Sequence, residues 1–161
     1  MSEGELLQIE KSRKLNITEE VYYEIIRKKT ATLIAACTAA GALSSGASAE
    51  QIEQMREFGK NLGMAFQIRD DLLDYERTNL SGKPSGNDLK EKKMTLPLIH
   101  VLDRQSSTKK RQILRTIKRD HKKEKKIAPI VQFVKDNGGL EYARKKMTEY
   151  RDAALKILDS Y

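Results

Sequence analysis

Three aspartates and a glutamine occupy helical spacing in one short stretch of the sequence: Gln67, Asp70, Asp71 and Asp74. On an α-helix, residues three and four positions apart share a face, so we expect these side chains to point the same way. Like charges at that spacing destabilise a helix by roughly a few tenths of a kcal/mol per pair, and a bound cation would offset this cost. Because Mg²⁺ prefers carboxylate, phosphate and water oxygens, the stretch predicts a Mg²⁺-diphosphate site. The alternative is a solvated acidic face, since short motifs also match by chance.

A glycine-containing loop with lysines follows this acidic stretch. It contains Gly82-Lys83-Pro84-Ser85-Gly86-Asn87-Asp88 and then Lys92-Lys93-Met94-Thr95-Leu96-Pro97. The lysine ammonium is a compact point charge that suits phosphate oxygens. A metal ion on one side and an ammonium group on the other would hold a leaving diphosphate between them.

In this order, the series FQIRDDLLD, GKPSGNDL and KKMTLPLI resembles the trans-isoprenyl diphosphate synthases, at their second aspartate-rich motif and following lysine loop. Two earlier segments agree with that family, namely Glu3-Gly4-Glu5 with Gln8, and Tyr22 followed by Lys29-Thr30-Ala31. The resemblance covers nearly the whole chain but only the family's C-terminal half. It implies a single all-α domain over 1–161, the C-terminal part of an isoprenoid-synthase helical bundle whose N-terminal portion, with the first aspartate-rich motif, is absent.

The resemblance implies a Mg²⁺-dependent prenyltransferase that condenses isopentenyl diphosphate with an allylic prenyl diphosphate. It makes Asp70 the direct metal ligand, with Asp71 and Asp74 acting through metal-bound water. Substrate binding would fall to Lys29, Thr30, Gln67, Lys83 and Lys93, and catalysis to Asp70, Lys29 and Lys83. The family often has glycine where this chain has Lys92, which cannot relax the backbone as glycine would.

A complete metal site in this family normally uses both aspartate-rich faces, and this sequence has one of them. We therefore expect a homodimer or a partner chain to be needed for catalysis. Two alternatives stay open. A non-catalytic helical subunit or dimerisation module would not need the intact Asp70, Asp71, Asp74, Lys29 and Lys83. A class I terpene cyclase of related fold would consume a prenyl diphosphate without isopentenyl diphosphate.

The 161 residues carry a formal charge of +8, and much of the excess lies in 109–111 and 119–126. No nucleic-acid-binding motif and no interleaved aromatics accompany these runs, so we expect a solvated face and no nucleic-acid partner. The sequence has neither an apolar run long enough to span a membrane nor a secretory signal, which predicts a cytoplasmic protein. A prenyl product is apolar, and contact with a membrane surface is compatible with it. Cys37, the one cysteine, is expected to be a small buried side chain.

Apolar periodicity predicts helices throughout and gives no strand signal. We expect the tail of a helix over 1–14, helices over 18–42 and 50–75, a loop over 76–93, and helices starting near 95, 107, 127 and 140. His100 is expected to pack against its helix and His121 to be solvated. A helical stripe in 50–75 is predicted to be core; it consists of Ile52, Met55, Phe58, Leu62, Phe66 and Leu73.

Overall fold

In the computed structural model, which describes residues 2–76 and 86–160, every regular element is helical. The helices are α1 (Ser2–Lys14), α2 (Glu19–Ile26), the π-helical turn η1 (Arg27–Ala31), α3 (Thr32–Ser44), α4 (Ala49–Glu76), α5 (Asn87–Lys90), α6 (Leu96–Asp103), α7 (Ser107–Asp120), α8 (Glu124–Asp136) and α9 (Gly139–Leu158). The predicted all-α class is confirmed. Among the described residues, no helix is both long and apolar enough to cross a lipid bilayer.

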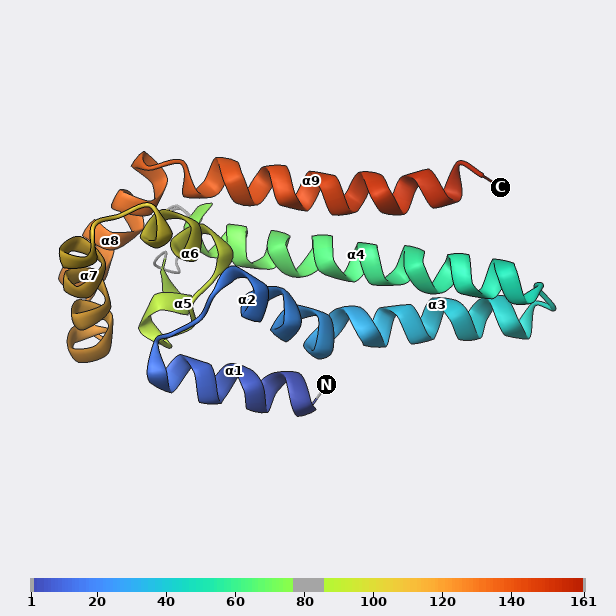
Figure 1. Ribbon diagram of the computed structural model, residues 1–161, viewed down its shortest axis with the longest axis horizontal. Helices are drawn as coiled ribbons and strands as arrows, with labels where there is room; N and C mark the ends of the chain where they lie inside the picture. The colour runs from blue at the N-terminus through green and yellow to red at the C-terminus, as the bar shows by residue number, and fades with distance from the viewer. Residues whose placement is uncertain (1, 77–85, 161) are drawn as a thin grey trace.

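The long helix α4 lies between α3 and α9, and the shorter helices α5 to α8 gather at one end of this layer (Figure 1). The second half of α4 supplies the centre of the core, where Ile68, Leu72 and Tyr75 are fully buried. Helix α6 is buried along almost its whole length against this end. The acidic stretch of α4 is therefore placed where the long helices meet the short ones.

Two glycines allow α4 to approach the preceding helices closely. A Cβ on Gly59 would lie 2.8 Å from the carbonyl oxygen of Ile34, and a Cβ on Gly63 would lie 2.6 Å from the Cα of Ala31. Contacts that short do not occur between real side chains and backbone. Close packing thus compensates for the low helix propensity of these glycines.

Local capping signals in the sequence set several helix starts. The Thr18 side chain accepts from the amide of Val21. Ser48 and Gln51 form a reciprocal capping box, with distances of 2.9 Å and 3.3 Å, at the start of α4. The helix predicted over 18–42 is present but is interrupted by the π-helical turn. The loop predicted over 76–93 contains the helix α5, which corrects the prediction there. Residues 77–85 of that loop are outside the described part, and the correction does not apply to them.

Three packing predictions are wrong. No residue of the stripe on α4 that we expect to be core is buried: half of them are partly exposed and half are exposed, with Phe66 at 60%. Helix α4 instead buries a different face, containing Ile68 and Leu72, against its neighbours. Cys37 is exposed on α3. His121 is partly buried, and its Nδ1 lies 2.6 Å from the carbonyl oxygen of Lys90. His100, in contrast, packs as expected, stacked on Tyr142 at 3.7 Å.

Candidate functional site

Asp71 is fully buried in α4, and both its carboxylate oxygens are engaged by side chains. The Tyr22 hydroxyl of α2 donates to Oδ2 at 2.7 Å, and the Lys93 ammonium donates to Oδ1 at 2.8 Å. Burial raises the pKa of the Asp71 carboxyl, while Lys93 and Tyr22 oppose that shift. The result is a buried ion pair that ties α4 to α2 and to the segment between α5 and α6.

Lys93 bridges two carboxylates, since its Nζ also lies 3.2 Å from Oδ2 of Asp88. Burial disfavours the Lys93 charge, but Asp71 and Asp88 outweigh burial and raise the pKa of Lys93. Burial, together with the nearby Asp71 and Asp74, raises the pKa of Asp88 to about 6, against the effect of Lys93. Asp88 is thus a member of the charged cluster at this site, although we had given it no role from the sequence.

Asp74 holds the start of α5. Its Oδ1 accepts from the amide of Asn87 at 3.1 Å and its Oδ2 accepts from the amide of Asp88 at 3.0 Å. The Asp74 carbonyl also accepts from the amide of Gly86 at 3.2 Å. The carboxylate therefore satisfies amides that a helix start would leave unpaired. Asp74 fixes where the chain re-enters the fold beyond residue 85.

Asp70 differs from its two neighbours because it is exposed. It makes no hydrogen bond or ion pair within the described residues, whereas Asp71 and Asp74 are both committed to partners. In the same part of the chain, no three His, Cys, Asp or Glu side chains are placed to hold one metal ion. The expectation that the three aspartates point the same way is wrong, since Asp70 is exposed whereas Asp71 and Asp74 are buried and bonded to partners. That Asp70, Asp71 and Asp74 serve a metal ion stays a prediction.

Lys29 and Thr30 lie in the π-helical turn η1, opposite the acidic helix. The Thr30 hydroxyl donates to Oε1 of Gln67 at 2.8 Å, and Lys29 Nζ donates to Oε1 of Gln8 at 3.3 Å. Of these four residues, Lys29, Gln8 and Gln67 border a cavity of about 10 Å³, about the space that one water needs, whose lining also includes Tyr22, Ile25 and Lys93. A π-helical turn frequently marks a functional site. Here it places Thr30 in hydrogen-bond contact with Gln67, and Lys29 on the wall of the same cavity as Gln67.

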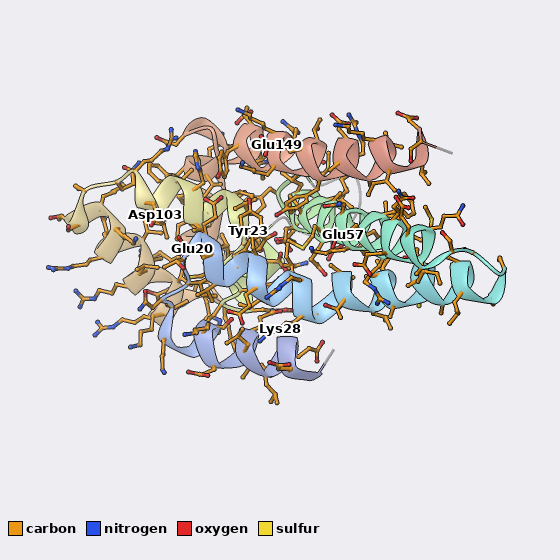
Figure 2. All side chains as sticks on the ribbon, turned by 45° about the vertical axis from the view of Figure 1, so that its right-hand side comes forward. Glu20, Tyr23, Lys28, Glu57, Asp103 and Glu149 are labelled. Carbon is orange, nitrogen blue, oxygen red and sulfur yellow. The ribbon has the colours of Figure 1, made fainter. Side chains whose placement is uncertain are left out.

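Helix α1 is pressed against the π-helical turn. A Cβ on Gly4 would lie 2.5 Å from the amide nitrogen of Lys29. Glu3 pairs with Lys28 at 2.7 Å, and Figure 2 shows Lys28 on the stretch that faces α1. The Glu3-Gly4 pair and Gln8 therefore all act on the segment that carries Lys29 and Thr30. In the sequence these residues form a motif without an assigned role, although a spacing of about one helical turn between Gly4 and Gln8 is compatible with a shared contact.

One of the predicted site residues, Lys83, lies outside the described residues. Asp70 bonds to no other predicted residue within the described part of the chain. The remaining predicted residues fall into two groups. In the first, Thr30 bonds to Gln67, and Lys29 lines the same small cavity as Gln67. In the second, Lys93 bonds to Asp71 and to Asp88, whose amide bonds to Asp74. Tyr22 borders the small cavity next to the first group and bonds to Asp71 in the second.

Comparisons with known proteins agree with this arrangement. The family model for polyprenyl synthetase matches residues 1–134. A short chain isoprenyl diphosphate synthase from Methanothermobacter thermautotrophicus is 39% identical over 142 residues, which cover 88% of this chain and 43% of that protein. Octaprenyl diphosphate synthase from Escherichia coli is 34% identical over 159 residues, covering 98% of this chain and 49% of that protein.

A similar solved structure is that of a polyprenyl synthase from Caulobacter crescentus CB15, complexed with calcium and isoprenyl diphosphate. It superposes with a TM-score of 0.88 at 37% identity, over 99% of this chain and 49% of that chain. This chain therefore spans about half the length of the relatives that it matches.

Proposed function

The chain belongs to the polyprenyl synthetase family, and we propose that it provides the second aspartate-rich face of a prenyltransferase site. The reaction is the condensation of isopentenyl diphosphate with an allylic prenyl diphosphate to give a longer polyprenyl diphosphate. Residues 1–161 would form the C-terminal portion of the synthase fold, and the first aspartate-rich face would come from another segment or from a partner chain. The exposed side chains of Leu62, Phe66 and Leu73 on α4 support an additional covering partner.

The observation that carries the proposal is the hydrogen bond between Thr30 and Gln67 at 2.8 Å. It joins the π-helical turn to α4 one turn before the exposed Asp70. A cation from Lys29, a hydroxyl from Thr30 and an acidic side chain from Asp70 are thereby presented by two adjacent elements. Such a set suits an allylic diphosphate, which needs both positive charge and hydrogen-bond donors.

The donor set fits Mg²⁺, which is generally bound by one or two carboxylates plus substrate phosphates and water. Asp70 would hold the ion directly because its oxygens have no other partner in the described part of the chain. Asp71 and Asp74 would act through metal-bound water, from positions fixed by Tyr22, Lys93 and the α5 amides. When bound, Mg²⁺ neutralises diphosphate oxygens and orients the leaving group. The calcium in the Caulobacter complex supports a divalent cation in a site of this family.

The chain's own residues have separate tasks in this proposal. Lys29 and Thr30 bind and orient the allylic diphosphate, and Lys83 adds a second cation to it. Lys93 supports the carboxylates from behind, because its ammonium is already bound to Asp71 and Asp88. The single hydroxyl hydrogen of Thr30 is donated to Gln67 in this structure, so donation by Thr30 to the diphosphate would replace the bond to Gln67. Electrostatic stabilisation of the departing diphosphate is the largest benefit that these fixed charges offer.

The test is incorporation of labelled isopentenyl diphosphate onto farnesyl diphosphate with Mg²⁺, together with calorimetric titration of farnesyl diphosphate in the presence and absence of Mg²⁺. The wild-type chain is compared with Asp70→Ala and with Asp159→Ala, an exposed aspartate at the far end of α9. We expect Mg²⁺-dependent binding that Asp70→Ala abolishes and Asp159→Ala retains. Elongation by the chain alone would place both faces of the site in an assembly of this chain. Binding that does not depend on Mg²⁺ and is undiminished in Asp70→Ala would contradict the metal role.

A further inference from the structure

The positive charge of this protein is concentrated in one segment. Residues 107–126 hold ten Lys or Arg and two acidic residues, so their formal charge of +8 equals that of the whole chain. The remaining residues carry equal numbers of basic and acidic side chains. A net charge distributed in this way produces a local field at one surface rather than a general positive balance.

Helix α7 presents this charge on a single exposed stripe. Arg111, Arg115, Lys118 and Arg119 follow each other at intervals of four, three and one, which places them on one side of the helix, and all four are exposed. The opposite side buries Ile113 and Ile117. We call these four cations the basic stripe. An amphipathic helix that is cationic outside and apolar inside is held in place by its packing, so its outer face is free for a partner.

The basic stripe is not neutralised within the protein. Of the ten cations in 107–126, Lys110 pairs with Asp103 and Lys123 pairs with Asp120. In the described part of the chain, no carboxylate lies within ion-pair distance of the four stripe residues. By contrast, α4 and α9 pair basic side chains with acids on the same helix, such as Lys60 with Glu57 and Lys146 with Glu149. The exposed charge of α7 is therefore available to an external anion.

A groove next to the stripe adds an apolar floor. Arg115, Lys118 and Arg119 line a hollow of about 490 Å³ together with Lys14, Leu15 and Leu114. The cationic side chains at its rim suit the phosphate of a phospholipid. The leucines at its floor suit the adjoining part of the acyl chain. Sites for single-stranded nucleic acid add aromatic side chains on which bases stack, and none lines the hollow.

From this charge distribution we infer that the basic stripe of α7 docks the protein on an anionic membrane surface. Clusters of four to eight Lys or Arg on an amphipathic helix are typical of anionic-lipid binding. The choice of a membrane over other anionic partners rests in part on the proposed function, whose prenyl product has an apolar chain that partitions into lipid. The binding itself requires neither substrate nor metal.

The test is flotation of the full chain with phosphatidylcholine vesicles that contain or lack about one third phosphatidylglycerol, a composition that supplies the negative surface potential required. The test variant carries Arg111→Gln, Arg115→Gln, Lys118→Gln and Arg119→Gln. The matched control carries Arg56→Gln, Lys145→Gln, Arg151→Gln and Lys156→Gln, four exposed cations of α4 and α9. Circular dichroism checks that both variants keep the helical fold.

We expect the wild-type chain to bind the anionic vesicles and to release as salt rises, because the Debye length shortens. Each cation near such a surface contributes about fivefold in affinity. The stripe variant should therefore bind the anionic vesicles at least about tenfold more weakly than wild type. The control variant should bind them within about threefold of wild type. Equal binding to both vesicle types, or equal loss in both variants, would overturn the inference. Tighter binding to a duplex oligonucleotide than to the vesicles at the same salt would also overturn it. Because the assay contains no prenyl substrate, its failure is separate from failure of the proposed reaction.

Discussion

The hydroxyl of Tyr22 donates to Oδ2 of Asp71 at 2.7 Å, across 49 residues of sequence. The carboxylate is completely buried, and its other oxygen accepts from Lys93. A buried charge of this kind is tolerated only when its oxygens are paired. Tyr22 is therefore a structural partner of the acidic motif and connects α2 to α4 directly behind the proposed substrate face.

We expect Tyr22→Phe to destabilise the protein by about 1–3 kcal/mol, because one oxygen of the buried carboxylate loses its donor. The free energy of unfolding in urea measures this effect. Tyr23→Phe is the matched control, since the Tyr23 hydroxyl is buried without a hydrogen-bond partner in the described part of the chain. Its removal should cost less than about 0.5 kcal/mol. Equal losses in the two variants would mean that the bond to Asp71 contributes nothing specific.

The three aspartates of the motif should differ in their effect on stability. Asp74→Ala removes the acceptor of two backbone amides at the start of α5, and we expect a loss of about 1–3 kcal/mol. Asp70→Ala removes an exposed carboxylate without a partner in the described residues, and we expect a change within about 0.5 kcal/mol. Urea unfolding of both variants, without added metal, makes the comparison. A loss in Asp70→Ala as large as that in Asp74→Ala would show that Asp70 also has a structural partner.

Gly4 should not accept even a methyl group. A Cβ there would lie 2.5 Å from the Lys29 amide nitrogen, so Gly4→Ala must displace α1 from the π-helical turn at a cost of about 1–3 kcal/mol. Gly41→Ala is the control, because nothing lies within 4 Å of its Cβ position on α3, and we expect it to stabilise the protein by about 0.5–1 kcal/mol. Thermal unfolding and hydrogen exchange of the α1 amides report both effects. Unchanged protection of α1 in Gly4→Ala would rule out the displacement.

Features that depend on a few neighbouring residues could be predicted from the sequence. The capping box of Ser48 and Gln51 and the cap at Thr18 each depend on two residues three positions apart, a spacing that is visible in the sequence. Burial was harder to predict, because periodicity identifies an apolar face but not what covers it. Phe66 was assigned to the core, yet the face of α4 that packs inside carries Ile68 instead. Cys37 was misplaced for the same reason.

Which residues make up the site could be predicted in part from the sequence, but the hydrogen bonds and ion pairs that connect them could not. Helical spacing placed Gln67 and the aspartates on one side of α4, but it could not distinguish a free carboxylate from one already bonded. That distinction depends on Lys93, which is 22 residues beyond Asp71 in the sequence, and on the still more distant Tyr22. Asp88 lies only five residues from Lys93, and it joins the cluster because that lysine also pairs with the buried Asp71.

Asp88 should make stability depend on pH in a direction opposite to that of an ordinary paired carboxylate. Burial and the nearby acids raise the pKa of Asp88 from 3.8 to about 6, so the folded state holds its proton more tightly than the unfolded state does. The contribution of Asp88 to the free energy of unfolding is fully present below pH 4 and is lost as pH rises towards 6. The loss is up to about 3 kcal/mol. Asp88→Asn cannot ionise and should lack this component.

The measurement is the difference in free energy of unfolding between wild type and Asp88→Asn, determined at several values from pH 4 to pH 7. We expect this difference to fall as pH rises through that interval, whatever the constant offset caused by losing the contact with Lys93. Asp120→Asn is the control: Lys123 lowers the pKa of Asp120, so its contribution is steady over the interval and declines only at more acid pH. A flat difference for Asp88→Asn would mean that Lys93 keeps Asp88 ionised in the folded protein throughout, and the buried cluster would then hold two full negative charges around one ammonium.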